Sequence, residues 1–251
     1  MSGPSVELSG VRRAFRRRRD EIVALDDLNL RAAGGEVLGV VGPSGCGKST
    51  LLELVAGLQE PDAGRVQVAG AADRRAACAY MPQRDLLLPW RDALANAALA
   101  LESAGVPRRE ARRRAVPLFE RFGLADFERA RPAELSGGMR QRVAFLRTLL
   151  AGRPVLLLDE PFASLDSITR HALQEWLAGA LQAEPRTVLL VTHDVEEALY
   201  LGDRVAVLSP RPGRVVAELD VPFPRPRPRR ATVTDPAFTR LEERALEALE
   251  G

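Results

Sequence analysis

Three short runs of apolar residues along the chain predict buried strands. They lie at residues 37–41, 155–158 and 187–192. Strands that are apolar on both faces and separated by helical stretches are typical of a parallel sheet covered on both sides. Further strand patterns, the last of them weaker, occupy residues 77–81, 204–208 and 214–219. An α/β core is therefore expected.

The middle and the end of the chain follow other patterns. Helical periodicity dominates residues 91–150, which predicts a helical insertion into the core. A helix is also expected at residues 195–201, and an amphipathic helix at residues 236–249. Alternating prolines at residues 222–230 remove backbone donors and clash with a preceding helical turn. That segment is expected to be a stiff extended linker.

The length of 251 residues suits one large domain, because single hydrophobic cores stop growing at about 250–300 residues. We expect this domain to cover residues 5–251. Its α/β core would comprise residues 5–90 and 152–220, and its helical subdomain residues 91–151. A linker and a C-terminal helix would follow at residues 221–251.

Composition narrows the class of protein. With 46% hydrophobic and 28% charged residues the chain is globular, and its net charge of +2 is too small for a dedicated nucleic-acid-binding surface. No apolar stretch approaches the ~18 residues of a membrane-spanning helix, and the first residues do not follow a signal-peptide pattern. The chain is therefore expected in the cytosol. Cys46 and Cys78 lack metal-ligand spacing and are expected to be free thiols.

A glycine-rich segment around the only lysine predicts a phosphate-binding loop. Of the 36 basic residues Lys48 alone is lysine, which indicates a position where a guanidinium cannot replace a compact ammonium. The loop follows a buried strand, opens a helix and comprises Gly42, Pro43, Ser44, Gly45, Cys46, Gly47, Lys48 and Ser49. Backbone N–H groups and the helix N-terminus would bind phosphate oxygens. Lys48 would reach the β- and γ-phosphates, and Ser49 would hold Mg²⁺.

Polar residues follow the other two buried strands. Asp159 and Glu160 stand at a carboxyl strand end, where parallel sheets bind their ligands. Asp159 suits an outer ligand of Mg²⁺, and Glu160 suits the general base that activates water. His193 follows the third strand and is interpreted as a donor to the γ-phosphate, with a helix-capping or solvated histidine as the alternative. His171 has no motif around it and is expected on a helix surface.

A second anion site is expected at another helix N-terminus. In the segment 135–142, Ser136 is a good N-cap, Gly137 and Gly138 expose the backbone, and a helical pattern begins at Met139. One chain would then carry two phosphate sites.

With these motifs the chain resembles the ATP-binding-cassette (ABC) subunits of membrane transporters over nearly its whole length. Six family elements occur in order, at residues 42–50, Gln83, 135–141, 156–160, 164–166 and His193. The resemblance implies a P-loop NTPase fold with an N-terminal antiparallel β part and an inserted helical subdomain. It also implies ATP and Mg²⁺ as ligands. In the implied head-to-tail homodimer, Ser136 and Gly138 of one subunit close over ATP bound by Lys48 of the other.

The resemblance assigns roles to further residues. It implies that Gln83 contacts Mg²⁺ or water, that Thr50 and Asp166 belong to the nucleotide site, and that Phe15 stacks on adenine. A core or surface phenylalanine is the alternative for Phe15. Met139 stands where many members carry glutamine, and contacts from the backbone and a serine hydroxyl would preserve the link to the γ-phosphate.

Three segments resemble a narrower group of importers, which serve nitrate, aliphatic sulfonates, taurine and pyrimidine precursors of thiamine. They are residues 86–90, 161–162 and 210–214, and they are expected to contact neither nucleotide nor solute. Residues 86–90 would either dock a permease helix or pack into the helical insertion. The implied partners are a second cassette subunit, membrane permease subunits and, indirectly, a solute-binding protein. The implied location is the cytoplasmic face of the cell membrane.

Two basic segments admit other interpretations. The arginines within residues 12–19 could attract nucleic acid or anionic lipid. The alternative is a solvated loop. The Pro/Arg segment before Arg230 is either a plain linker or a contact for lipid headgroups or a partner. Soluble cassette proteins acting on DNA or ribosomes share the nucleotide motifs, and phosphate-loop kinases share the first of them. The compact insertion and residues 135–141, which match the signature segment of the ABC family, favour transport, with no nucleic-acid partner.

Overall fold

A six-stranded sheet forms the centre of the computed structural model, which describes residues 3–17, 20–163 and 165–250. In spatial order its strands are β5 (Cys78–Met81), β6 (Val155–Asp159), β7 (Thr187–Thr192), β3 (Val37–Val41), β8 (Arg204–Leu208) and β9 (Val215–Asp220). The first five strands are parallel, and β9 is antiparallel to β8. The prediction of a parallel α/β core is confirmed.

Both faces of the central sheet are buried. In β3, Val37 and Val41 pack into one apolar cluster, whereas Leu38 and Val40 pack into the other. Because successive side chains of a strand point to opposite faces, one strand contributes to two cores. This explains why the sequence shows continuous apolar runs rather than alternation.

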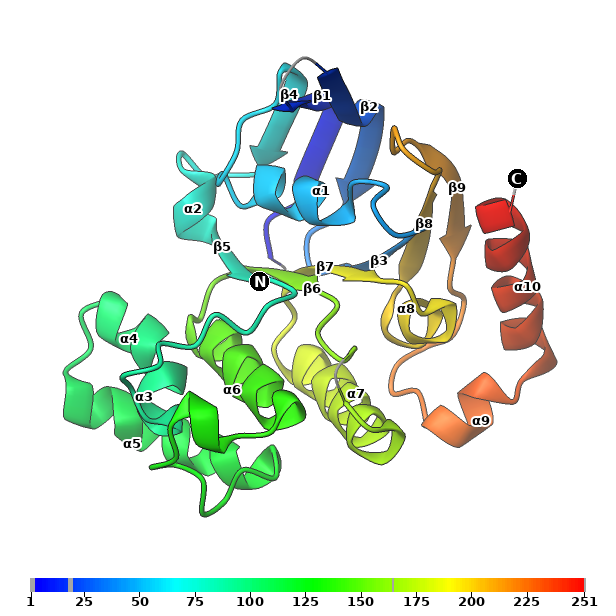
Figure 1. Ribbon diagram of the computed structural model, residues 1–251. Coiled ribbons are helices and arrows are strands. Elements are labelled where there is room, and N and C mark those ends of the chain that lie inside the picture. Colours follow the sequence, from blue (N-terminus) through cyan, green and yellow to red (C-terminus); the bar gives the residue numbers. More distant parts are fainter. Residues whose placement is uncertain (1–2, 18–19, 164, 251) are drawn as a thin grey trace.

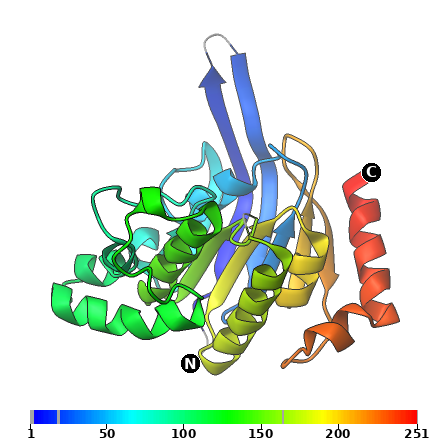
Figure 2. The same ribbon diagram turned by 60° about the horizontal axis from the view of Figure 1, so that its bottom comes forward.

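An antiparallel sheet and one helix cover the first face (Figure 1). The sheet has the order β2 (Asp20–Ala32), β1 (Val6–Arg17) and β4 (Ala63–Val68), and α1 (Lys48–Val55) lies between it and the central sheet. The short helix α2 (Arg74–Ala77) leads into β5. Figure 2 shows β1 and β2 extending well beyond the rest of the molecule.

Helices cover the second face. Between β5 and β6 the structure forms helices, turns and loops without a strand, as predicted for a helical insertion. These helices are α3 (Ala93–Ala97), α4 (Leu99–Ser103), α5 (Arg108–Arg121), the 3-10 helix η1 (Pro132–Glu134) and α6 (Gly137–Leu150). Beside them lie α7 (Ser167–Ala183) and α8 (Val195–Leu201). None of the helices in the described ranges has the length and apolar composition needed to cross a bilayer.

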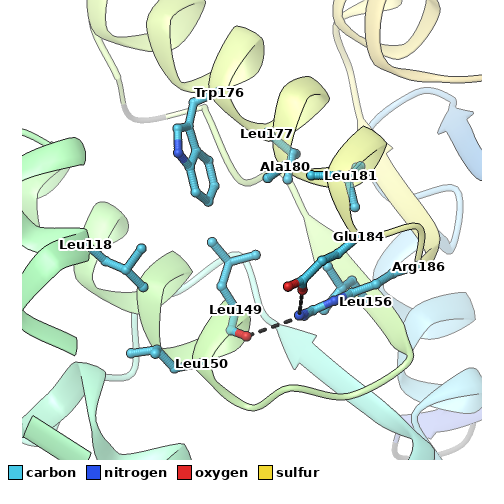
Figure 3. A pocket seen from close by; sticks show the side chains of 11 residues that line it. Leu118, Leu149, Leu150, Leu156, Trp176, Leu177, Ala180, Leu181, Glu184 and Arg186 are labelled. Atoms are coloured by element: carbon cyan, nitrogen blue, oxygen red, sulfur yellow. Dashed lines mark hydrogen bonds and ion pairs between the residues drawn. The ribbon is translucent and has the colours of Figure 1, made fainter. Parts of the chain in front are cut away.

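An apolar cavity of about 300 Å³ lies between α5, α6 and α7 (Figure 3). Leucines and Trp176 line it, and Arg186 donates to the Glu184 carboxylate at its edge, at 3.1 Å. The Trp176 ring meets Phe122 edge-on, with 4.7 Å between centroids. The cavity therefore marks incomplete packing between the helical insertion and α7.

The chain ends in two helices, α9 (Arg229–Val233) and α10 (Pro236–Glu250), beside β9 (Figure 1). The amphipathic helix expected near the end is confirmed as α10. The prediction that residues 222–230 contain no helix is wrong at its end, because Arg229 and Arg230 open α9. The prolines stop at Pro228, so every later residue of α9 has a backbone N–H to donate.

Arg227 closes the C-terminal end of α8. Its side chain is only 3% exposed. It donates to the carbonyls of Leu199 at 3.3 Å, Tyr200 at 3.0 Å, Gly202 at 2.6 Å and Phe223 at 2.8 Å. Carbonyls at a helix C-terminus have no partner within the helix and attract a cation. Burial lowers the pKa of Arg227 to about 10, so the guanidinium remains charged at neutral pH.

The neighbouring arginines are also bound to the domain. Arg225 donates to the Asp203 carboxylate at 3.0 Å. Arg229 donates to the Gln174 side-chain oxygen at 2.6 Å and lies 4.8 Å from the centre of the Tyr200 ring. The Pro/Arg segment is therefore a strap over α7 and α8 rather than the plain linker that the sequence favoured.

Replacing Arg227 by Ala should lower the free energy of unfolding by about 1–3 kcal/mol, because it leaves several buried carbonyls without donors. Arg230→Ala is the matched control, since Arg230 belongs to the same segment but is exposed. Urea denaturation of both variants measures the difference. Equal stability of the two proteins would contradict a structural role for the Arg227 contacts.

Candidate active site

The loop between β3 and α1 has the geometry of an anion cradle. Gly45 and Gly47 have positive φ angles of 76° and 111°, which side chains other than glycine rarely adopt. A Cβ on Gly47 would lie 2.8 Å from the Ala24 carbonyl oxygen, so glycine is required there for space as well. The loop ends in the free N-terminus of α1, which has no side-chain cap. Such an end binds phosphate through backbone N–H groups.

Lys48 is the first residue of α1, directly after this loop, and is only 7% exposed. Its ammonium donates to the carbonyls of Gly42 at 2.7 Å and Pro43 at 3.0 Å. The Cys46 sulfur lies 3.9 Å from the ammonium, and burial raises the pKa of this thiol. The loop thus holds one localised positive charge in place and keeps the adjacent cysteine protonated.

A polar pocket of about 280 Å³ gathers most of the predicted site residues. Those that line it are Phe15, Ser44, Gly45, Gly47, Lys48, Ser49, Thr50, Gln83, Asp159 and Glu160. Ile22, Ala24 and Arg211 complete the lining. The pocket lies at the carboxyl ends of β3 and β6, where parallel sheets bind ligands. This polar pocket, rather than the apolar cavity of Figure 3, is the candidate active site.

Two adjacent carboxylates have different environments in this pocket. Asp159 is 2% exposed, and burial raises its pKa, although Ser49 and the Tyr80 hydroxyl, which donates to it at 3.4 Å, act in the opposite direction. Glu160 has a φ of 48°, an unfavourable backbone conformation for a side chain of this size. Its carboxylate accepts from the Gln83 amide at 3.1 Å and lies 3.4 Å from His193 Nδ1. The strained turn therefore places the carboxylate expected to activate water beside Gln83 and His193.

The oxygen donors of the pocket fit a magnesium ion. Ser49, Gln83 and Asp159 offer a hydroxyl, an amide and a carboxylate, all oxygen ligands of the kind that Mg²⁺ takes. Among the described residues no cluster of three or more His, Cys, Asp or Glu side chains could hold a metal alone. The protein would thus supply part of the coordination shell, and phosphate oxygens and water the rest.

Phe15 of β1 lines the same pocket as the carboxylates. The Arg13 guanidinium carbon lies 4.9 Å from the centre of its ring. Asp62 fixes this part of β1, since it accepts from the Ala14 amide at 2.6 Å and from Arg13 at 2.8 Å. These bonds lower the pKa of Asp62, the Ala14 amide having the largest effect. Phe15 is half-buried and lines the pocket, and its stacking on adenine stays a prediction.

The predicted signature segment, residues 135–141, does not line this pocket in the described part of the chain. Ser136 caps α6 by accepting from the Met139 amide at 3.2 Å, as expected, and Gly137 and Gly138 form the first turn. Asp166 caps α7 through the Thr169 amide at 3.0 Å. None of these residues lines the pocket of the same chain, as far as the described residues show. Ser164, the first residue of the family element expected at residues 164–166, lies outside the described residues.

Three pocket residues were not predicted, namely Ile22, Ala24 and Arg211. Residues 210–214 were expected to avoid the nucleotide, but Arg211 in the loop between β8 and β9 lines the pocket. That expectation stays a prediction, but the loop packs on the phosphate loop through Gly213 and Cys46, a contact that only the tertiary structure shows. The signal available in the sequence was the Pro-Arg-Pro-Gly-Arg turn itself, whose spacing does not reveal what it touches.

The site has the features of a P-loop nucleotide-binding protein. A glycine-rich turn joins a strand to a helix that begins at a buried lysine, and two acidic residues stand at the end of the neighbouring strand. A family model described as ABC transporter matches residues 25–163. The chain belongs to this family and is an ATPase subunit of an ABC transporter.

Similar proteins extend over most of the chain. The nitrate import ATP-binding protein of Synechococcus elongatus is 42% identical over 244 residues, covering 95% of this chain and 89% of the relative. An aliphatic sulfonates import ATP-binding protein of Rhodococcus jostii is 48% identical over 213 residues, covering 85% of this chain and 83% of the relative. The dimeric cassette MJ0796, bound to ADP and phosphate after hydrolysis, superposes with a TM-score of 0.79 at 31% identity, covering 87% of this chain and 99% of that chain. The expected fold class is confirmed.

Proposed function

We propose that this subunit powers the import of a small solute through a separate membrane permease, as a homodimer at the cytoplasmic membrane face. The solute would be nitrate, a sulfonate, taurine or a pyrimidine precursor of thiamine, the substrates named for its relatives. A solute-binding protein would deliver it. The observation that carries the proposal is the pocket that joins Lys48, Glu160 and Gln83 on a chain of this family.

The residues of the pocket divide the work of hydrolysis. Lys48 and the backbone N–H groups of its loop hold the phosphates. Glu160 accepts a proton from the attacking water, while Gln83 and His193, both in contact with its carboxylate, fix its orientation. Mg²⁺ held by Ser49, Gln83 and Asp159 would neutralise negative charge that develops on the phosphates.

The second phosphate site explains why two subunits are needed. Ser136 and Gly138 form a glycine-bearing helix N-terminus that does not reach the pocket of its own chain. In a two-fold dimer this helix end would face the triphosphate held by the partner subunit, so each ATP lies between two chains. ATP would close the dimer, and loss of the γ-phosphate would reopen it.

A surface beside Gln83 suits contact with the permease. Leu86 is 55% exposed with a φ of 44°, and Trp90 is 71% exposed. Leu87 between them is buried, so only part of residues 86–90 packs inward. Arg147 of α6 donates to the Leu86 carbonyl at 2.9 Å. An exposed and strained apolar segment fixed to α6 would link a docked permease helix to the signature helix.

Mixing two inactive variants tests the shared site. Lys48→Ala removes the cation of one half-site, and Gly138→Asp places a carboxylate where the partner's phosphate would lie. Asp in a first helical turn favours the helix, so the fold of α6 should survive. Each variant alone should be inactive, whereas an equal mixture should recover about a quarter of wild-type ATPase activity, from the one intact site in each mixed dimer.

This experiment has a control variant and a result that would contradict the shared site. Gly179→Asp, on the exposed face of α7 with open space around it, should remain as active as wild type. If the mixture of Lys48→Ala and Gly138→Asp hydrolyses ATP no faster than the two proteins apart, the composite site is wrong.

A further inference from the structure

Arg211 stands at one end of the candidate active site. It lines the pocket together with Phe15 and Ile22, which face each other across the β1–β2 ladder. It also borders a neighbouring hollow that Ile22 shares. Lys48, Asp159 and Glu160 line the pocket but do not border that hollow. Ligand atoms next to Arg211 would therefore belong to the nucleobase end.

The loop that carries Arg211 is fixed to the phosphate loop and to β2. The Gly213 amide donates to the Ala24 carbonyl at 2.9 Å. A Cβ on Gly213 would lie 2.2 Å from the Cys46 carbonyl oxygen, so the two loops are in direct backbone contact. Ser209 accepts from the Arg214 amide at 3.1 Å, which closes the turn. The backbone of the turn that carries Arg211 is therefore anchored to β2 and to the phosphate loop.

The charge of Arg211 is not used by the described part of the protein. Its guanidinium forms no hydrogen bond or ion pair with another described residue. The nearby acidic groups have other partners, since Glu21 pairs with Arg12 at 3.2 Å and Asp26 pairs with Arg214. An exposed, unpaired guanidinium on a fixed loop is suited to bind a ligand that enters beside it.

The part of the pocket expected to hold the nucleobase suits a planar cation. A guanidinium stacks on aromatic rings and attracts their π-electrons, which a lysine ammonium does less well. Phe15 offers a ring on one side of this end, and Arg211 enters from the β8–β9 loop. We propose that Arg211 contacts the nucleotide and covers the base that lies against Phe15. This inference rests on the proposed function, because it needs ATP in this pocket.

Calorimetric titration of two ligands tests the assignment. ATP carries a base and inorganic triphosphate does not, so a base contact affects only the first. Arg211→Ala should weaken ATP binding about 5- to 30-fold and leave triphosphate binding within about twofold of wild type. Arg211→Lys keeps the charge without the plane and should still lose several-fold in ATP affinity.

Arg214→Gln is the matched control, because this arginine belongs to the same turn but pairs with Asp26 and does not line the pocket. It should bind ATP like wild type. Unchanged ATP affinity of Arg211→Ala would overturn the proposal, as would equal losses for both ligands or an equal loss in Arg214→Gln. Failure of the wild-type protein to bind ATP at all would instead refute the proposed function.

Discussion

Replacing Glu160 by Gln is expected to leave ATP binding intact and to slow ATP turnover by about 100- to 10,000-fold, the range typical for loss of a general base. Glutamine has the same size, and its amide oxygen can accept the bond that Gln83 donates at 3.1 Å. It cannot accept a proton from water. ATP should then persist in the site, and a dimer should accumulate. Phosphate release and size-exclusion chromatography with ATP measure the two effects.

Glu184→Gln controls for the loss of a negative charge. Glu184 is 76% exposed and lies at the edge of the apolar cavity, so this variant should hydrolyse ATP normally. Undiminished hydrolysis by Glu160→Gln would contradict the assignment of the base. Loss of ATP binding in the same variant would indicate a structural role in the strained turn instead.

Replacing Lys48 by Ala should weaken ATP binding by at least about 100-fold, because it removes charge-assisted hydrogen bonds worth about 1.5–3 kcal/mol each. The loss should depend on the phosphates that Lys48 reaches. We therefore expect a large effect on ATP and ADP and little effect on AMP. Equilibrium titration with the three nucleotides measures this dependence.

Arg153→Ala serves as the control for Lys48→Ala, since Arg153 is an exposed cation next to the amino end of β6, opposite the pocket. A melting curve of each variant shows whether the loop still folds without the two carbonyl contacts of Lys48. Equal affinity losses for AMP and ATP would mean that the substitution disrupts the loop rather than a phosphate contact.

The central sheet could be predicted because its strands are buried on both faces. A run such as β7, with all six residues buried, shows in the sequence without any knowledge of its neighbours. The N-terminal antiparallel sheet is different. Strand β1 is interrupted by bulges and pairs with β4, some 50 residues away. Its presence was implied by the family resemblance, and its register depends on contacts that no local pattern encodes.

The phosphate loop and the two carboxylates could also be predicted, since each is local and lies at the end of a buried strand. The arginines could not. Arg227 binds carbonyls of α8 more than twenty residues earlier, and Arg211 reaches the pocket because Gly213 packs on Cys46. In a chain whose cations are almost all arginine, the sequence does not separate these residues from solvated ones.

The position of Lys48 also determines how this protein responds to chemical labelling. Acylating reagents modify amines and leave guanidinium groups untouched, so the many arginines offer them no target. The only lysine side chain is 7% exposed and engaged by two carbonyls. Modification of that side-chain amine, as distinct from the amine at the N-terminus of the chain, would therefore report transient opening of the nucleotide cradle.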